Sequence, residues 1–313
     1  MSSSTTPPNS LPTIPPHLLK STQENWIIGM IIGSICYGIL FTLGIACLRS
    51  LRLLPRQDRF WSQRRILMIH VALLLVLNTV LLVKNARANL VAVFDTRPER
   101  LTYFYLDRAN ILVVIVLAMT DGLLVWRCYM VQRVLLQGKP ARWNHLCWVI
   151  PMILWIAFTG SGIAAVVVFD PTRLLALDPE PLTLVFLLLS SFCNFFLNLF
   201  STTNIVIRLL IHRRTMIASF GPRSTLSNFH LQIIGIILES AVINLPMAIA
   251  SATCSLIVGG FGFLAWQIGV PAQSFSSVLV IYQVAKGRAV GSERIKRQPE
   301  SHHLDTLVYS QEA

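Results

Sequence analysis

The amino-acid sequence predicts an all-α polytopic membrane protein, a bundle of seven transmembrane helices with its N-terminus outside the cell and its C-terminus in the cytosol. Three observations predict this class. Of the 313 residues, 54% are hydrophobic and only 13% are charged, whereas soluble domains average about 25% charged residues. Seven apolar stretches are long enough to cross a bilayer. Most Lys and Arg residues fall in alternate loops between these stretches, as membrane topology requires.

The seven apolar stretches are the predicted spans, because a helix crosses the bilayer core of about 30 Å with about 20 apolar residues. They are 26–48, 66–83, 110–131, 148–169, 182–207, 231–258 and 261–285. Five contain no Asp, Glu, Lys or Arg, whereas the third contains Asp121 and Arg127 and the sixth contains Glu239. Only Gly259 and Gly260 separate the last two stretches, so a bundle of six helices is the main alternative.

The Lys and Arg residues set the expected orientation of the helices. Of the 26, 18 lie in the first, third and fifth loops and in the C-terminal tail, and seven lie on the other side. The positive-inside rule therefore puts the C-terminus in the cytosol. We expect a multi-pass protein of the plasma membrane that contacts the lipid bilayer. We expect no nucleic-acid partner, because the basic residues do not cluster on a soluble face.

Two tails flank the predicted seven-helix domain, which we place at 26–285. Residues 1–25 are rich in Ser, Thr and Pro, and residues 286–313 are basic and then mildly acidic. Segments of such composition bury too little apolar surface to fold. We therefore expect a disordered extracellular tail at 1–25 and a disordered cytosolic tail at 286–313.

Six polar side chains interrupt the apolar stretches near the middle of the membrane. They are Asn78, Asp121, Asn194, Asn198, Glu239 and Gln273. At about 1.5 Å of helical rise per residue they share one layer of the bilayer. Carboxylates and amides are costly in lipid, so we expect the six to converge on one polar core that binds a ligand. The alternative is that they only hold neighbouring helices together through hydrogen bonds.

The fifth and third stretches add detail to this polar core. Polar residues of the fifth stretch recur every three or four positions, which puts them on one helical face; they are Ser191, Asn194, Asn198 and Thr202. In the third stretch, Arg127 lies about four residues from the expected cytosolic end, and its long side chain can reach away from lipid. We expect an ion pair between Arg127 and Glu239 that restrains the third helix against the sixth.

The third stretch also carries a short motif, DGLLVWRCY at 121–129. It resembles the Asp-x-Leu-Leu-Val-Trp/Tyr-Arg-Cys-Tyr segment of a group of seven-helix integral membrane proteins of mushroom-forming (basidiomycete) fungi. The layout of apolar stretches over residues 26–285 is similar as well. The resemblance implies a fungal integral membrane protein with the layout of a G-protein-coupled receptor, and it implies no reaction or ligand.

Together these features predict a receptor-like sensor whose polar core binds a ligand of unknown identity. The basic third and fifth loops would meet a cytosolic signalling partner. A transporter or channel for a small solute, a proton or a cation is the alternative, with Asp121 and Glu239 as ion sites. An intramembrane enzyme is less favoured, because His70, His212 and His230 lack the spacing of metal ligands and no nucleophile motif is present. We therefore expect no catalytic residue, metal or cofactor.

Overall fold

The computed structural model describes residues 16–53, 61–94, 111–135, 143–168, 181–220, 244–250, 253 and 260–297, all of them helical. The six long helices are α1 (Pro16–Leu53), α2 (Trp61–Phe94), α4 (Ile111–Leu135), α5 (Trp143–Val168), α7 (Pro181–Phe220) and α9 (Gly260–Arg297). All six are long and apolar enough to cross a membrane. Since a helix satisfies its own backbone hydrogen bonds in lipid, the chain is an all-α, multi-pass membrane protein.

Six of the seven predicted spans correspond to these helices. The predicted sixth span, 231–258, lies outside the described residues except for a helical stretch at 244–250 and residue 253. The count of seven and the place of Glu239 therefore stay predictions. α1 begins at Pro16 and α9 continues to Arg297, so both helices extend into the segments expected to be tails. Lys, Arg, Leu and Glu in these extensions are good helix formers, which allows a helix to continue beyond its apolar part.

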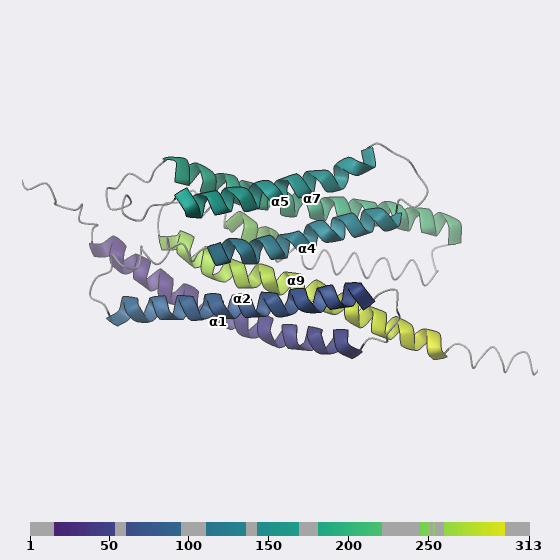
Figure 1. Cartoon of the computed structure of the whole chain (residues 1–313), viewed down its shortest axis with the longest axis horizontal. Helices are drawn as coiled ribbons and strands as arrows, with labels where there is room; N and C mark the ends of the chain where they lie inside the picture. The colour runs from purple at the N-terminus through teal and green to yellow at the C-terminus, as the bar shows by residue number, and fades with distance from the viewer. Residues whose placement is uncertain are drawn as a thin grey trace, which may run out of the picture.

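The six helices lie roughly along one common direction (Figure 1). α1 begins at one end of the bundle, and the yellow end of α9 lies at the other. α9 packs against α1, α2 and α4, and α4 also contacts α5 and α7. α4 thus connects α2 and α9 to the α5–α7 pair, and polar groups on its buried faces are shielded from lipid.

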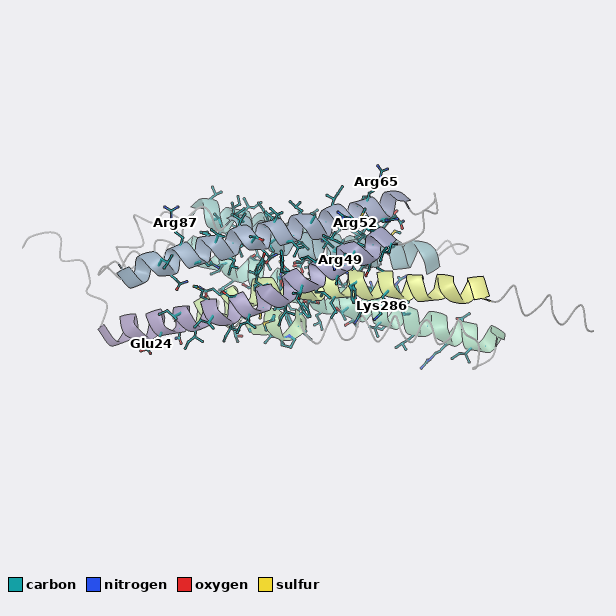
Figure 2. The ribbon with its side chains drawn as sticks, turned by 90° about the horizontal axis from the view of Figure 1, so that it is seen from below. Glu24, Arg49, Arg52, Arg65, Arg87 and Lys286 are labelled. Atoms are coloured by element: carbon teal, nitrogen blue, oxygen red, sulfur yellow. The ribbon has the colours of Figure 1, made fainter. Side chains whose placement is uncertain are left out.

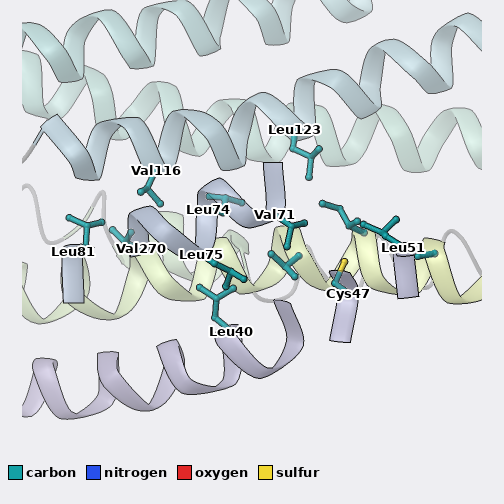
Figure 3. Close-up of a cluster of buried hydrophobic side chains, with 13 residues drawn as sticks. Leu40, Cys47, Leu51, Val71, Leu74, Leu75, Leu81, Val116, Leu123 and Val270 are labelled. Atoms are coloured by element: carbon teal, nitrogen blue, oxygen red, sulfur yellow. The ribbon is translucent and has the colours of Figure 1, made fainter. Parts of the chain in front are cut away.

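An apolar cluster fills the space where α1, α2, α4 and α9 meet (Figure 3). Leu40, Leu74, Val116 and Val278 come from these four helices, and all four side chains are fully buried. The surface that surrounds the bundle is apolar too, with Ile69 as an example at 65% exposure. An apolar exterior over an apolar core is the arrangement expected where hydrocarbon replaces water.

α9 is the most buried of the six described helices, and its span is also the least apolar. Gln273, Ser274, Ser276 and Ser277 are all buried. Polar side chains are tolerated at this depth because neighbouring helices cover them and supply hydrogen-bond partners. The central place of α9 therefore puts its polar residues in the interior of the bundle.

Exposed charged side chains lie toward the two ends of the bundle (Figure 2). Those toward one end are Arg49, Arg52, Arg65 and Lys286, and those toward the other are Glu24 and Arg87. Such a distribution fits water at both ends and lipid around the middle.

Candidate functional site

The buried carboxylate of Asp121 joins α4 to α7. The Asn194 side chain donates from Nδ2 to Asp121 Oδ2 at 2.8 Å, and Asn198 Nδ2 donates to Asp121 Oδ1 at 3.3 Å. Asn198 Nδ2 also lies 3.2 Å from Asn194 Oδ1. All three residues are buried. Two asparagines one turn apart thus present amide groups to both oxygens of one carboxylate, as the spacing on the fifth stretch leads one to expect.

A small cavity lies beside this network, and we call it the Asp121 cavity. Its volume is about 20 Å³, and its polar lining comes from α4, α7, the stretch 244–250 and α9; it comprises Thr120, Asp121, Arg127, Thr202, Asn244, Ser276 and Ser277. A cavity of this size has room for one water molecule. Asn244 Oδ1 is buried and has no hydrogen-bond partner within the described part of the chain.

Arg127 turns toward α9 and shares the Asp121 cavity with the carboxylate. Its Nη2 donates to the backbone carbonyl of Ser277 at 3.1 Å. This bond ties α4 to α9, six residues along α4 from Asp121, which binds α7. Glu239, the expected partner of Arg127, lies outside the described residues, so the Arg127–Glu239 ion pair stays a prediction.

The motif at 121–129 lies where α4 contacts three other helices. Asp121 faces α7, and Arg127 faces α9. A Cβ atom added at Gly122 would touch the indole ring of Trp155 on α5 at 3.5 Å. That indole donates from Nε1 to the Ala118 carbonyl of α4 at 2.8 Å. The segment therefore contacts α5 through the region of Ala118 and Gly122, while Asp121 and Arg127 bind α7 and α9.

A second polar contact joins α2 to α9. Asn78 Nδ2 donates to Ser274 Oγ at 3.1 Å and to the Leu74 carbonyl of its own helix at 2.8 Å. Asn78 and Ser274 are both buried. Gln273 is buried next to Ser274, and its Oε1 has no hydrogen-bond partner among the residues that the structure describes.

A larger, partly open cavity lies beside Asn78, and we call it the Asn78 cavity. Its volume is about 60 Å³. Four helices line it, with Gly29, Met30, Gly33 and Tyr37 from α1, Asn78, Leu81, Leu82 and Asn85 from α2, Val113 from α4, and Gln267, Val270 and Pro271 from α9. Met30, Val113 and Gln267 lie close to the first residues of their spans. The cavity therefore occupies the half of the bundle in which α1 and α9 begin.

Two glycines of α1 shape the Asn78 cavity. Gly29 and Gly33 are buried, and their spacing of four puts them on one face of the helix. A Cβ atom at Gly33 would lie 2.9 Å from the backbone carbonyl oxygen of Gln267 on α9. Small residues at this spacing let two membrane helices approach closely. α1 also bonds to α2, because the Tyr37 and Thr79 hydroxyls share a hydrogen bond of 2.6 Å.

The predicted polar core is thus divided in the structure. Asp121, Asn194 and Asn198 form one group, and Asn78 pairs with Ser274 in another. Gln273 is buried on α9 beside Ser274, and its Oε1 accepts no hydrogen bond from either group. The expectation of a single converging site was therefore too simple for these five residues. Glu239 lies outside the described part of the chain.

Sequence reasoning missed several residues that line the cavities, above all Tyr37, Asn85 and Gln267. Asn85 lies just past the predicted second span. Gln267 lies about two turns before Gln273, the residue that marks the predicted mid-membrane layer on this helix. A signal was present, because Gln267, Pro271 and Ser274 follow helical spacing along one side of α9. The glycine pair at 29 and 33 was a further signal for close packing.

Among the described residues, no group of three or more His, Cys, Asp or Glu side chains lies close enough together to hold a metal ion. The two cavities therefore offer amide, hydroxyl and single charged groups, which are suited to hydrogen bonding with a ligand. Comparisons of the chain with protein-family models, curated proteins and solved structures found no match.

Proposed function

We propose that this chain is a receptor-like sensor with seven membrane spans, an extracellular N-terminus and a cytosolic C-terminus in the plasma membrane. In this proposal the Asn78 cavity receives the ligand, and the Asp121 network transmits its presence toward the cytosol. The 18 Lys and Arg residues expected on one side support the orientation. The third and fifth loops contact the signalling partner.

The observation that carries the proposal is the Asn78 cavity. It is concave, its walls are largely apolar, and four helices each contribute to it. Tyr37, Asn78, Asn85 and Gln267 supply hydrogen-bonding groups at its wall. Binding sites for small molecules have this composition, with a few placed polar groups in an apolar pocket.

α9 supplies a physical link from the Asn78 cavity to the Asp121 cavity. Gln267 and Pro271 line the first, and Ser276 and Ser277 line the second. Ser277 follows Gln267 by ten positions on one helix, a rise of about 15 Å. A ligand that shifts α9 at Gln267 therefore also displaces the carbonyl that Arg127 binds, which changes the contact between α4 and α9.

The end of α7 provides the surface for a cytosolic partner. The apolar span of α7 ends at Ile211, and the helix continues to Phe220. The sequence places Arg213 and Arg214 in this extension. A basic helix that extends beyond the bilayer suits binding to an acidic surface on a signalling protein.

A complex with a heterotrimeric G protein tests the proposed function. The purified chain in lipid nanodiscs should retain the nucleotide-free G protein on a size-exclusion column and release it when a non-hydrolysable GTP analogue is added. Arg214→Glu should weaken this complex several-fold, whereas Arg87→Glu, an exposed change near the opposite end, should leave it unchanged. Equal loss in both variants, or no complex at all, would contradict coupling through this end.

A transporter or channel is the second candidate, and the buried Asp121 carboxylate beside a polar cavity favours it. Intramembrane carboxylates commonly mark ion pathways. In this case the chain in sealed vesicles should carry protons or monovalent cations down a gradient. Asp121→Asn should abolish the flux measured with a pH-sensitive dye or a cation-sensitive dye. An unchanged flux in this variant would remove Asp121 from the pathway.

A further inference from the structure

We propose that the Asn78 cavity binds the uncharged head group of an amphiphile, a hydroxyl or an amide, while the apolar tail of the molecule lies against the lipid-facing surface of α1 and α2. The inference rests on the proposed function, because it names the ligand class of the same site. Charge, size and surroundings of the cavity each support it.

The absence of charged residues from the lining disfavours an ionic head group. None of the twelve residues that line the cavity is acidic or basic. Its polar members are the phenol of Tyr37 and the carboxamides of Asn78, Asn85 and Gln267, and each can both donate and accept a hydrogen bond. An ammonium or a carboxylate would enter without an opposite charge, and burial of an unpaired charge is costly. A hydroxyl or an amide would find complementary partners.

The size of the cavity limits what enters it. A volume of about 60 Å³ equals that of about two water molecules in the liquid. Pockets that enclose a whole drug-sized ligand are about 300–1,000 Å³. The cavity therefore accommodates a head group of a few heavy atoms, and the remainder of the molecule must lie outside it.

The surface beside the cavity is apolar. Ile31 on α1 and Val83 on α2 follow the lining residues Met30 and Leu82 directly, and they are 55% and 62% exposed. An alkyl or ring system that leaves the partly open cavity toward these two side chains would meet the same hydrocarbon environment as the lipid tails. The polar head and apolar tail of one amphiphile would thus both find suitable surroundings.

Three photoreactive probes test this ligand class. They share one diazirine-bearing alkyl chain and end in a primary alcohol, a carboxylate or an ammonium group. Each is added to the full chain in nanodiscs, irradiated, and mapped by peptide mass spectrometry. The alcohol should label residues 29–37 and 78–85 at least about tenfold more than either charged probe, because only the alcohol enters without an unpaired charge.

Two pairs of variants locate the labelling. Leu82→Phe, which extends a half-buried lining side chain into the cavity, should reduce labelling by the alcohol. Leu73→Phe makes the same change at an exposed position of α2 and should have no effect. Asn78→Leu removes a hydrogen-bonding group and should weaken labelling about three- to tenfold. Gly38→Ala, where an added Cβ meets no atom within 4 Å, serves as its control.

The outcomes separate this inference from the proposed function. Equal labelling by a charged probe would overturn the uncharged head group, and labelling that Leu82→Phe leaves unchanged would overturn the site. Selective labelling that the variants reduce supports the ligand class even if no G protein binds the chain, in which case only the sensor function fails. Proper folding of each variant is checked by its elution as a single species and by its melting temperature.

Discussion

The two polar regions of the interior differ in the charge of their side chains and in the space that remains beside them. At the α4–α7 contact, a carboxylate accepts bonds from two amides, and the adjoining space holds about one water molecule. At the α1–α2–α9 contact, all groups are neutral, and a cavity of about 60 Å³ remains beside Asn78. Gly33 of α1 lines this cavity and lets the backbone of α9 approach closely.

Polar residues that the sequence places near one depth of the membrane thus belong to separate helix contacts with different surroundings. The Asp121 network uses both oxygens of the buried carboxyl group in bonds between α4 and α7, so it holds these two helices together. The Asn78 region leaves a larger space whose lining contains no charged residue, so it suits a ligand. α9 contacts both regions, which makes it the element through which one can affect the other.

Asp121→Leu should have the largest effect on stability. The change leaves the buried amides of Asn194 and Asn198 without their acceptor, which should lower the free energy of unfolding by about 2–3 kcal/mol. Asp121→Asn retains one acceptor oxygen and should cost less. Unfolding in mixed micelles, followed by tryptophan fluorescence, measures both values.

The same experiment has an internal check. Replacing Asn194 and Asn198 by Leu in the Asp121→Leu background should recover part of the loss, because no buried amide then remains unsatisfied. If Asp121→Leu is as stable as the natural chain, the network does not stabilise the contact between α4 and α7.

Gly33→Ala should have the next largest effect and tests the other region. The new methyl group would lie 2.9 Å from a backbone oxygen of α9, so the two helices must separate. We expect a loss of about 1–3 kcal/mol, as for other overpacked sites. Gly38→Ala should be neutral or raise stability by up to about 1 kcal/mol, because the site is open and alanine favours helix. Equal melting temperatures for the two variants would refute the close contact between α1 and α9.

Arg127 and Glu239 should show the smallest effect, as a coupling between two changes. If the two side chains pair, Arg127→Ala and Glu239→Gln are non-additive in detergent thermal stability, with a coupling of about 0.6–1.7 kcal/mol. Arg127→Ala alone also removes the bond to the Ser277 carbonyl. If the two changes in stability are strictly additive, the Ser277 carbonyl is the supported partner of Arg127. The predicted ion pair between the third and sixth spans is then refuted.

Much of the fold could be predicted from the sequence, whereas the site could be predicted only in part. Apolar length marked six helices that the structure describes, and the spacing of Asn194 and Asn198 placed them on one buried face. Depth along a helix did not reveal that Asn78 and Asp121 belong to different contacts. Depth gives only the position of a side chain along the membrane normal. Which side chains meet also depends on the rotation of each helix about its axis.

The sequence by itself determined that this protein resides in lipid, because hydropathy and span length are local properties of the chain. It also determined which face of α7 is polar, since helical spacing is local too. Only the tertiary structure decided that α1 packs against α9 and that Asn78 bonds to Ser274, 196 residues away. In a bilayer, burial of apolar surface does not select one helix neighbour over another. The choice depends on close packing and on interhelical hydrogen bonds, which several helices form together.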